Sequence, residues 1–97
     1  MAKVVRSHLV DQQLAVIWRT IAVENEAAAD RLLLRIDQRL RHLREFPLMG
    51  RLREDIRARA RMLIEPPYLV LYDYHAHVEV VEIVTIVDGR RDLRDLF

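Results

Sequence analysis

Two neighbouring cations follow a strongly apolar stretch near residue 90. Arg90 and Arg91 come directly after the Asp88-Gly89 turn that ends the run VEIVTIV. A guanidinium group stays charged and presents a planar fork of donors, which suits a carboxylate or a phosphate. Three roles are therefore open for this pair: holding a phosphate during cleavage, binding an acidic protein surface, or facing water.

A second set of arginines alternates with apolar residues in RARARMLIE, residues 57–65. Alternation with a period of two predicts a strand that carries Arg57, Arg59 and Arg61 on one face. These side chains could converge with Arg90 and Arg91 into a basic patch. The alternative is a solvated face, where charge discourages strands of different molecules from pairing.

Other site chemistries find little support in the sequence. His75 and His77 form an H-x-H pair, but we expect both in a turn, and the chain has no cysteine to complete a metal site. There is no glycine-rich phosphate loop and no G-x-S-x-G motif. We therefore expect neither a metal nor a cofactor.

The elements that position these residues begin with a short strand at residues 2–6 and two helices. Apolar residues recur at helical spacing over residues 8–23, after the candidate N-cap Ser7. The same spacing continues after the candidate N-cap Asn25 and stops before Pro47. Because the link between the helices is very short, we expect an antiparallel helical hairpin.

Strand patterns dominate the second half of the chain. Residues 46–55 read as a loop containing Pro47 and Gly50, and YLVLYDY and residues 78–87 read as strands after the 57–65 strand. A helical hairpin covering a small antiparallel sheet is an α+β fold. We expect one domain over residues 1–97.

Charge and hydropathy limit the classes of partner. The 16 basic residues, all arginine except Lys3, face 15 acidic ones, which leaves a net charge of +1. Such a balance argues against direct, specific nucleic-acid binding. No apolar run approaches the roughly 18 residues of a membrane span. We expect a cytoplasmic protein without membrane contact.

Four segments in order resemble the RelE/ParE superfamily of bacterial toxins, and the ParE-like branch, known from plasmid stabilisation, more closely. They are LREFPLMGR at the end of the hairpin, ARMLIE, YLVLY, and VEIVTIVDGRRDL. The resemblance implies the toxin of a type II toxin–antitoxin module, neutralised by a cognate antitoxin. ParE-like members are held to act on DNA gyrase, whereas RelE-like members cut messenger RNA in the ribosome.

The two activities need different groups. Cleavage through a 2′-hydroxyl requires groups that accept and donate a proton, and arginine can only stabilise the added charge. Arg61 and Arg91 fall where the nucleases place such arginines, but the tyrosine that the nucleases commonly carry near the C-terminus is replaced by Leu96 and Phe97. Tyr68, Tyr72 and Tyr74 share one side of the middle strand, and a nuclease would need one of them as the substitute, for which we name Tyr72.

The sequence therefore favours a toxin that inhibits gyrase by protein contacts and is not an enzyme. A RelE-like ribosome-dependent endonuclease and an inactive relative that only binds an antitoxin-like partner remain alternatives. The predicted target-binding residues are Arg57, Arg59, Arg61, Arg90, Arg91, Asp92, Leu93, Leu96 and Phe97. In an alternative interpretation, the apolar residues Leu93, Leu96 and Phe97 pack on the core and the neighbouring charges face water. The antitoxin is expected to dock an amphipathic helix in a groove or to add a strand to a sheet edge.

Overall fold

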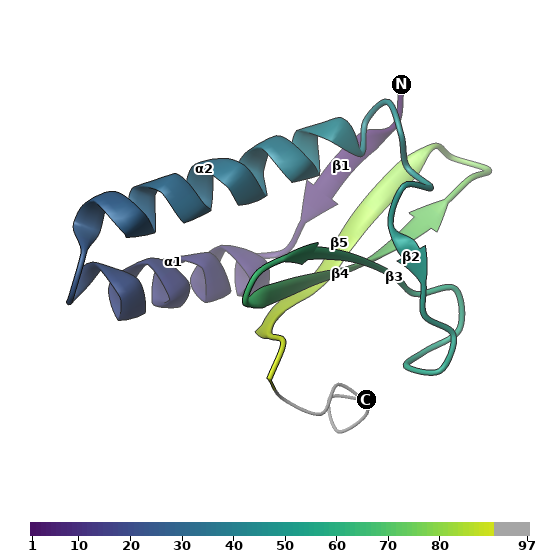
Figure 1. Ribbon diagram of the computed structural model, residues 1–97. Helices are drawn as coiled ribbons and strands as arrows, with labels where there is room; N and C mark the ends of the chain where they lie inside the picture. The colour runs from purple at the N-terminus through teal and green to yellow at the C-terminus, as the bar shows by residue number, and fades with distance from the viewer. Residues whose placement is uncertain (91–97) are drawn as a thin grey trace.

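The computed structural model describes residues 1–90 and confirms the α+β class. A helical hairpin lies over one face of a five-stranded sheet whose order is β1-β5-β4-β3-β2 (Figure 1). The strands are β1 (Lys3–Arg6), β2 (Arg51–Leu52), β3 (Arg61–Glu65), β4 (Tyr68–His75) and β5 (Val80–Asp88). The helices are α1 (His8–Ala22) and α2 (Glu26–His42).

Both predicted caps begin their helices. The Ser7 side chain accepts a hydrogen bond from the Val10 N–H at 3.4 Å, and Asn25 Oδ1 accepts one from the Ala28 N–H at 3.0 Å. These bonds satisfy donors that the first turn of a helix leaves without a partner. Between the helices, Trp18 Nε1 donates to Asp30 Oδ1 at 2.8 Å. Neither helix is long and apolar enough to cross a membrane within residues 1–90.

The sheet was predicted to be antiparallel, but it is mixed, because β1 runs parallel to β5 while the other pairs are antiparallel. The β1 register starts at Lys3 opposite Val80 and ends at Arg6 opposite Ile83. Beyond that point α1 lies beside β5: Gln13 Oε1 accepts from the Ile86 N–H at 2.9 Å, and Gln13 Nε2 donates to Thr85 Oγ1 at 2.8 Å. One glutamine thus takes over a backbone donor where strand pairing stops.

The sheet buries side chains on both faces. The helix-side core consists of Val10, Ile17, Leu32, Ile36, Leu40, Leu43, Leu63, Tyr68, Val70, Tyr72, Val81, Ile83 and Ile86, with Ala2 at its margin. On the opposite face Ile56 covers a smaller cluster with Met62, Leu71 and Val87. The 53–60 loop therefore acts as a small second layer. Removing these side chains from water supplies the main driving force for folding.

Three predictions about the strands need correction. Residues 46–55, predicted to be a loop, contain the short strand β2 at Arg51–Leu52. The strand predicted from residue 57 starts at Arg61, because Arg57 and Arg59 lie in the loop and Arg59 has a φ of 65°, which a strand does not allow. The turn predicted to contain His75 begins after it, since His75 is the last residue of β4 and pairs with Val80.

Candidate functional site

Arg61 and Tyr72 face each other on β3 and β4 and together hold the segment that follows α2. Arg61 Nη1 donates to the Gly50 carbonyl at 2.9 Å and to the Leu48 carbonyl at 3.1 Å. The Tyr72 hydroxyl donates to the Pro47 carbonyl at 2.8 Å and accepts from the Gly50 N–H at 2.8 Å. Four hydrogen bonds from two side chains therefore fix residues 47–50 against the sheet.

Tyr72 is fully buried, which limits what its hydroxyl can do chemically. Burial raises the pKa of the phenol above its usual 10.0, and the Gly50 N–H and the charge of Arg61 only partly oppose this rise. Gly50 approaches so closely that a Cβ atom there would lie 2.6 Å from the hydroxyl oxygen. A phenol without solvent contact and with both hydrogen bonds made to backbone is suited to structure more than to proton exchange.

Arg57 lies on the other face of the sheet. Its Nη2 donates to Oδ2 of Asp73, which is 6% exposed and belongs to the same strand as Tyr72 but points away from the helices. Tyr72 and Asp73 are neighbours on β4 and so face opposite sides of the sheet. Arg61 lies beside Tyr72 and Arg57 beside Asp73, so the two arginines lie on opposite faces. The expected row of three arginines is therefore not formed.

Arg59 and Arg61 do come together, at the β2 edge of the sheet. They line a hollow of about 340 Å³ with Leu48, Leu52, Glu54 and Tyr74. An adjoining hollow of about 410 Å³ shares Leu48 and Tyr74 and adds Phe46. We name Phe46, Leu48, Leu52, Arg59, Arg61 and Tyr74 the edge surface. Three of its apolar members are well exposed, with Phe46 at 59%, Leu48 at 58% and Leu52 at 46%.

Arg90 lies at the opposite end of the strands from Arg61. It follows Asp88, which pairs with Tyr68, whereas Arg61 pairs with Tyr72. Four strand residues separate these two positions, or about 13 Å. Arg90 Nε donates to Asp88 Oδ1 at 2.9 Å, and this hydrogen bond raises the pKa of Arg90 above its usual value. Arg90 thus stays a cation but does not join the edge surface.

The remaining predicted contacts are on the tail. Arg91, Asp92, Leu93, Leu96 and Phe97 lie outside the described residues. Their part in target binding stays a prediction.

A second concave region runs between the helical hairpin and β1. Two hollows of about 440 and 430 Å³ share Arg6, Asp37 and Leu40. Their apolar lining includes Leu14, Leu33 and Leu34, and their cations include Lys3, Arg6, Arg41 and Arg44. We name this region the helix groove.

Two cations of the helix groove have acidic partners and two do not. Arg41 pairs with Asp37 at 2.7 Å and Arg6 pairs with Asp11 at 2.9 Å. Within residues 1–90, Lys3 and Arg44 make no ion pair. The groove therefore has positive charge left for a partner.

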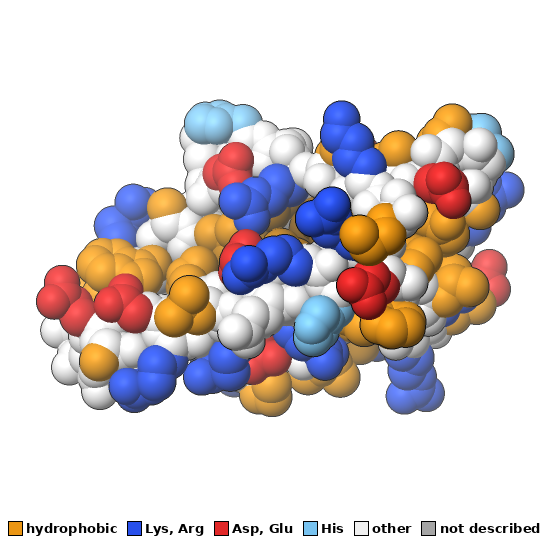
Figure 2. Space-filling model, turned by 90° about the horizontal axis from the view of Figure 1, so that it is seen from above, with side chains coloured by type: hydrophobic (Ala, Val, Ile, Leu, Met, Phe, Trp, Pro, Cys, Tyr) orange, Lys and Arg blue, Asp and Glu red, His pale blue; other side chains and the backbone are white. Residues whose placement is uncertain are grey.

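Charge is dispersed on the face that Figure 2 shows, which is the upper side of the molecule in Figure 1. Figure 2 shows Lys and Arg side chains there interspersed with acidic and hydrophobic ones. This face offers no continuous basic track of the kind that attracts a nucleic-acid backbone.

Sequence reasoning did not identify three residues that position the arginines and the edge surface: Gly50, Glu54 and Asp73. Gly50 was read only as a loop residue, and its close approach to Tyr72 joins positions 22 apart in the sequence. Asp73 and Glu54 carried no motif. The only available signal was an acidic residue inside the apolar YLVLYDY strand, since a buried carboxylate needs a partner.

Comparison with known proteins now places the chain. The profile of the family described as "ParE toxin of type II toxin-antitoxin system, parDE" matches residues 4–93. The chain belongs to the ParE toxin family. Toxin ParE3 of Caulobacter vibrioides is 34% identical to it over 94 residues, covering 96% of this chain and 92% of the relative.

The fold agrees with this membership in the ParE family. A solved structure of the chromosomal ParDE TA system from P. aeruginosa superposes with a TM-score of 0.76 at 16% identity. The match covers 91% of this chain and 96% of the other. At that identity the likeness supports the arrangement of helices and strands. The expectation of a ParE-like toxin from the type II toxin–antitoxin systems is therefore confirmed.

Proposed function

We propose that this ParE-family chain inhibits DNA gyrase by protein contacts through the edge surface and the tail. The observation that carries the proposal is the composition of the edge surface, where exposed Phe46 and Leu48 adjoin Arg59 and Arg61. Protein interfaces are enriched in aromatic residues and arginine. The choice of gyrase itself rests on the resemblance to the ParE-like branch.

The predicted residues take separate parts in this proposal. Arg59 and Arg61 contact the target at the edge surface. Arg57, held by Asp73, braces the loop that carries Arg59. Arg90, at the other end of the sheet, and the tail residues Arg91, Asp92, Leu93, Leu96 and Phe97 supply a second set of contacts.

Cleavage of messenger RNA is the second candidate, and one observation favours it. Glu54 and Tyr74 line the same hollow as Arg59 and Arg61, so a carboxylate and a phenol stand near two cations. These groups could exchange protons on a phosphate held by the arginines. Tyr72 is a poorer choice than Tyr74, because Tyr72 is fully buried.

Expression in growing cells separates the candidates. We expect growth arrest with trapped gyrase–DNA complexes and no new messenger RNA ends. Ribosome-dependent transcript cuts that disappear in Glu54→Gln or Tyr74→Phe would instead establish the nuclease. Normal growth at a verified level of folded protein would identify an inactive relative.

The proposed partner is a cognate antitoxin whose acidic amphipathic helix docks in the helix groove. The apolar lining from Leu14, Leu33 and Leu34 suits the apolar face of a helix, and Lys3 and Arg44 suit its acidic residues. Co-expression with the adjacent small reading frame should restore growth and yield a co-purifying complex. Continued toxicity without a complex would contradict this part of the proposal.

A further inference from the structure

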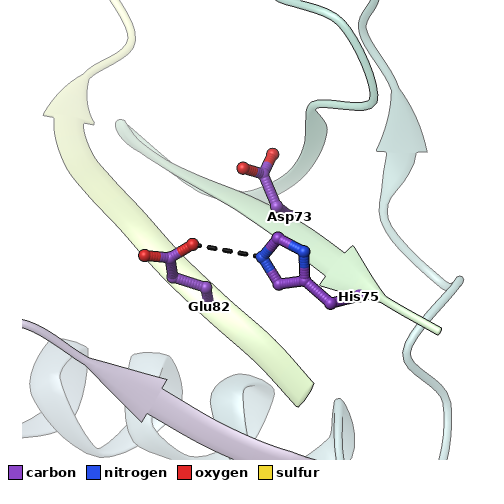
Figure 3. Close-up of side chains that lie close together, drawn as sticks. All are labelled: Asp73, His75 and Glu82. Carbon is purple, nitrogen blue, oxygen red and sulfur yellow. Dashed lines mark hydrogen bonds and ion pairs between the residues drawn. The ribbon is translucent and has the colours of Figure 1, made fainter. Parts of the chain in front are cut away.

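Three side chains with metal-binding atoms meet on the sheet face opposite the helices. Asp73 and His75 are two residues apart on β4, so they share a face, and Glu82 pairs with Asp73 on β5. Figure 3 shows the three side chains gathered over the two strands. One potential ligand atom from each lies within 4.8 Å of the others, and His75 Nε2 is 3.2 Å from Glu82 Oε1.

Asp73 supplies a second, independent observation. Its carboxylate is buried, and only Oδ2 is engaged by Arg57. Oδ1 is buried and has no hydrogen-bond partner among the described residues. An unsatisfied buried carboxylate oxygen is unfavourable, and the carboxylate that carries it belongs to the cluster with His75 and Glu82. A bound cation would satisfy it.

We propose that Asp73, His75 and Glu82 bind one divalent first-row metal ion, for which Zn²⁺ is the reference probe. An imidazole nitrogen favours zinc and its neighbours in the row over Mg²⁺ or Ca²⁺. Three protein ligands and one water complete the four-coordinate shell that zinc adopts in open sites. The site does not depend on the target of the toxin.

The geometry needs only small side-chain movements to close on a metal. Ligand bonds of about 2.0–2.2 Å place two tetrahedral ligands about 3.3 Å apart. His75 and Glu82 already have that separation at 3.2 Å. Both side chains are partly exposed, at 38% and 53%, so they can turn toward Asp73 without disturbing the core.

A metal ion here would also act on the neighbouring loop. It would share the Asp73 carboxylate with Arg57, which ties the 53–60 loop to the sheet. Two cations close to one carboxylate repel each other, so metal binding should loosen the Arg57 contact. The expectation of no metal site depended on His75 lying in a turn, and β4 places His75 beside Glu82 instead.

Calorimetric titration of the tag-free protein with ZnCl₂ tests the site. We expect saturable binding of one ion per chain, with Co²⁺ giving visible absorption bands typical of four-coordination. His75→Ala and Glu82→Gln should each weaken Zn²⁺ binding at least tenfold. Both positions are partly exposed, so the fold should survive, and circular dichroism verifies it.

His77→Ala is the matched control, because His77 lies in the turn beyond β4 and outside the cluster. It should bind Zn²⁺ as the parent chain does. Absence of saturable binding to the parent chain would overturn the proposal. Equal binding by folded His75→Ala, or an equal loss in His77→Ala, would also overturn it.

Discussion

A 2.8 Å hydrogen bond joins the backbone N–H of Gly50 to the hydroxyl of the buried Tyr72. The two residues are 22 positions apart, so the bond ties the segment after α2 to the middle of the sheet. The same segment carries Leu48, which the edge surface exposes. The buried Tyr72 therefore helps to fix the position of the edge surface.

Tyr72→Phe should destabilise the fold while leaving its shape intact. The substitution leaves the Gly50 N–H and the Pro47 carbonyl without the hydroxyl, a loss of about 1–3 kcal/mol in the free energy of unfolding. Urea denaturation measures it. Tyr74→Phe is the control, because Tyr74 is only partly buried and should lose less. Equal losses would contradict the role given to the Tyr72 hydroxyl.

The raised pKa of Tyr72 predicts a loss of stability in alkali. The folded state holds the neutral phenol, so its pKa lies above the unfolded value of 10.0. The stabilisation is fully present below about pH 10 and is lost as the pH rises through the folded pKa, by up to about 1.4 kcal/mol per pH unit. The difference between parent and Tyr72→Phe stability should therefore shrink from pH 9 to 11, about one unit either side of the usual tyrosine pKa. Parallel curves would show that Tyr72 is not responsible.

Gln13→Ala should also destabilise the fold, because it leaves the Ile86 N–H without its acceptor where β1 no longer covers β5. We expect a loss of about 1–3 kcal/mol in the free energy of unfolding. Gln12→Ala, the neighbouring exposed glutamine, should change stability by less than about 0.5 kcal/mol. Similar midpoints for the two variants in thermal unfolding would argue against the Gln13 contact.

Leu34→Glu should weaken the antitoxin complex without unfolding the toxin. Leu34 is 60% exposed in the helix groove, so a carboxylate there repels an acidic partner at little cost to the fold. We expect a loss of about 2 kcal/mol in binding free energy, roughly thirtyfold in Kd. Calorimetric titration with the antitoxin measures the affinity. The control Val23→Glu, at 86% exposure between the helices, should bind normally. If Leu34→Glu bound the antitoxin with unchanged affinity, the antitoxin would bind outside the helix groove.

The sequence predicted the helices well because their signals are local. Ser7 and Asn25 lie next to the turns they cap, and each apolar stripe repeats within one element. The β1–β5 pairing and the Tyr72–Gly50 bond join distant positions, and no neighbouring residue announces either. The RARAR alternation wrongly predicted that the strand begins at Arg57. Arg59 has a positive φ, so this segment is a loop although its sequence alternates with the period of a strand.

Inhibition of DNA gyrase supercoiling by the purified protein tests the account most directly. Arg59→Gln removes an exposed charge that makes no ion pair within residues 1–90, and Arg31→Gln removes a similarly exposed charge on α2. The parent chain and Arg31→Gln should inhibit at the same concentration, and Arg59→Gln should need at least tenfold more protein, about 1.4 kcal/mol of contact energy. Undiminished supercoiling with folded parent protein, or equal inhibition by Arg59→Gln, would contradict it.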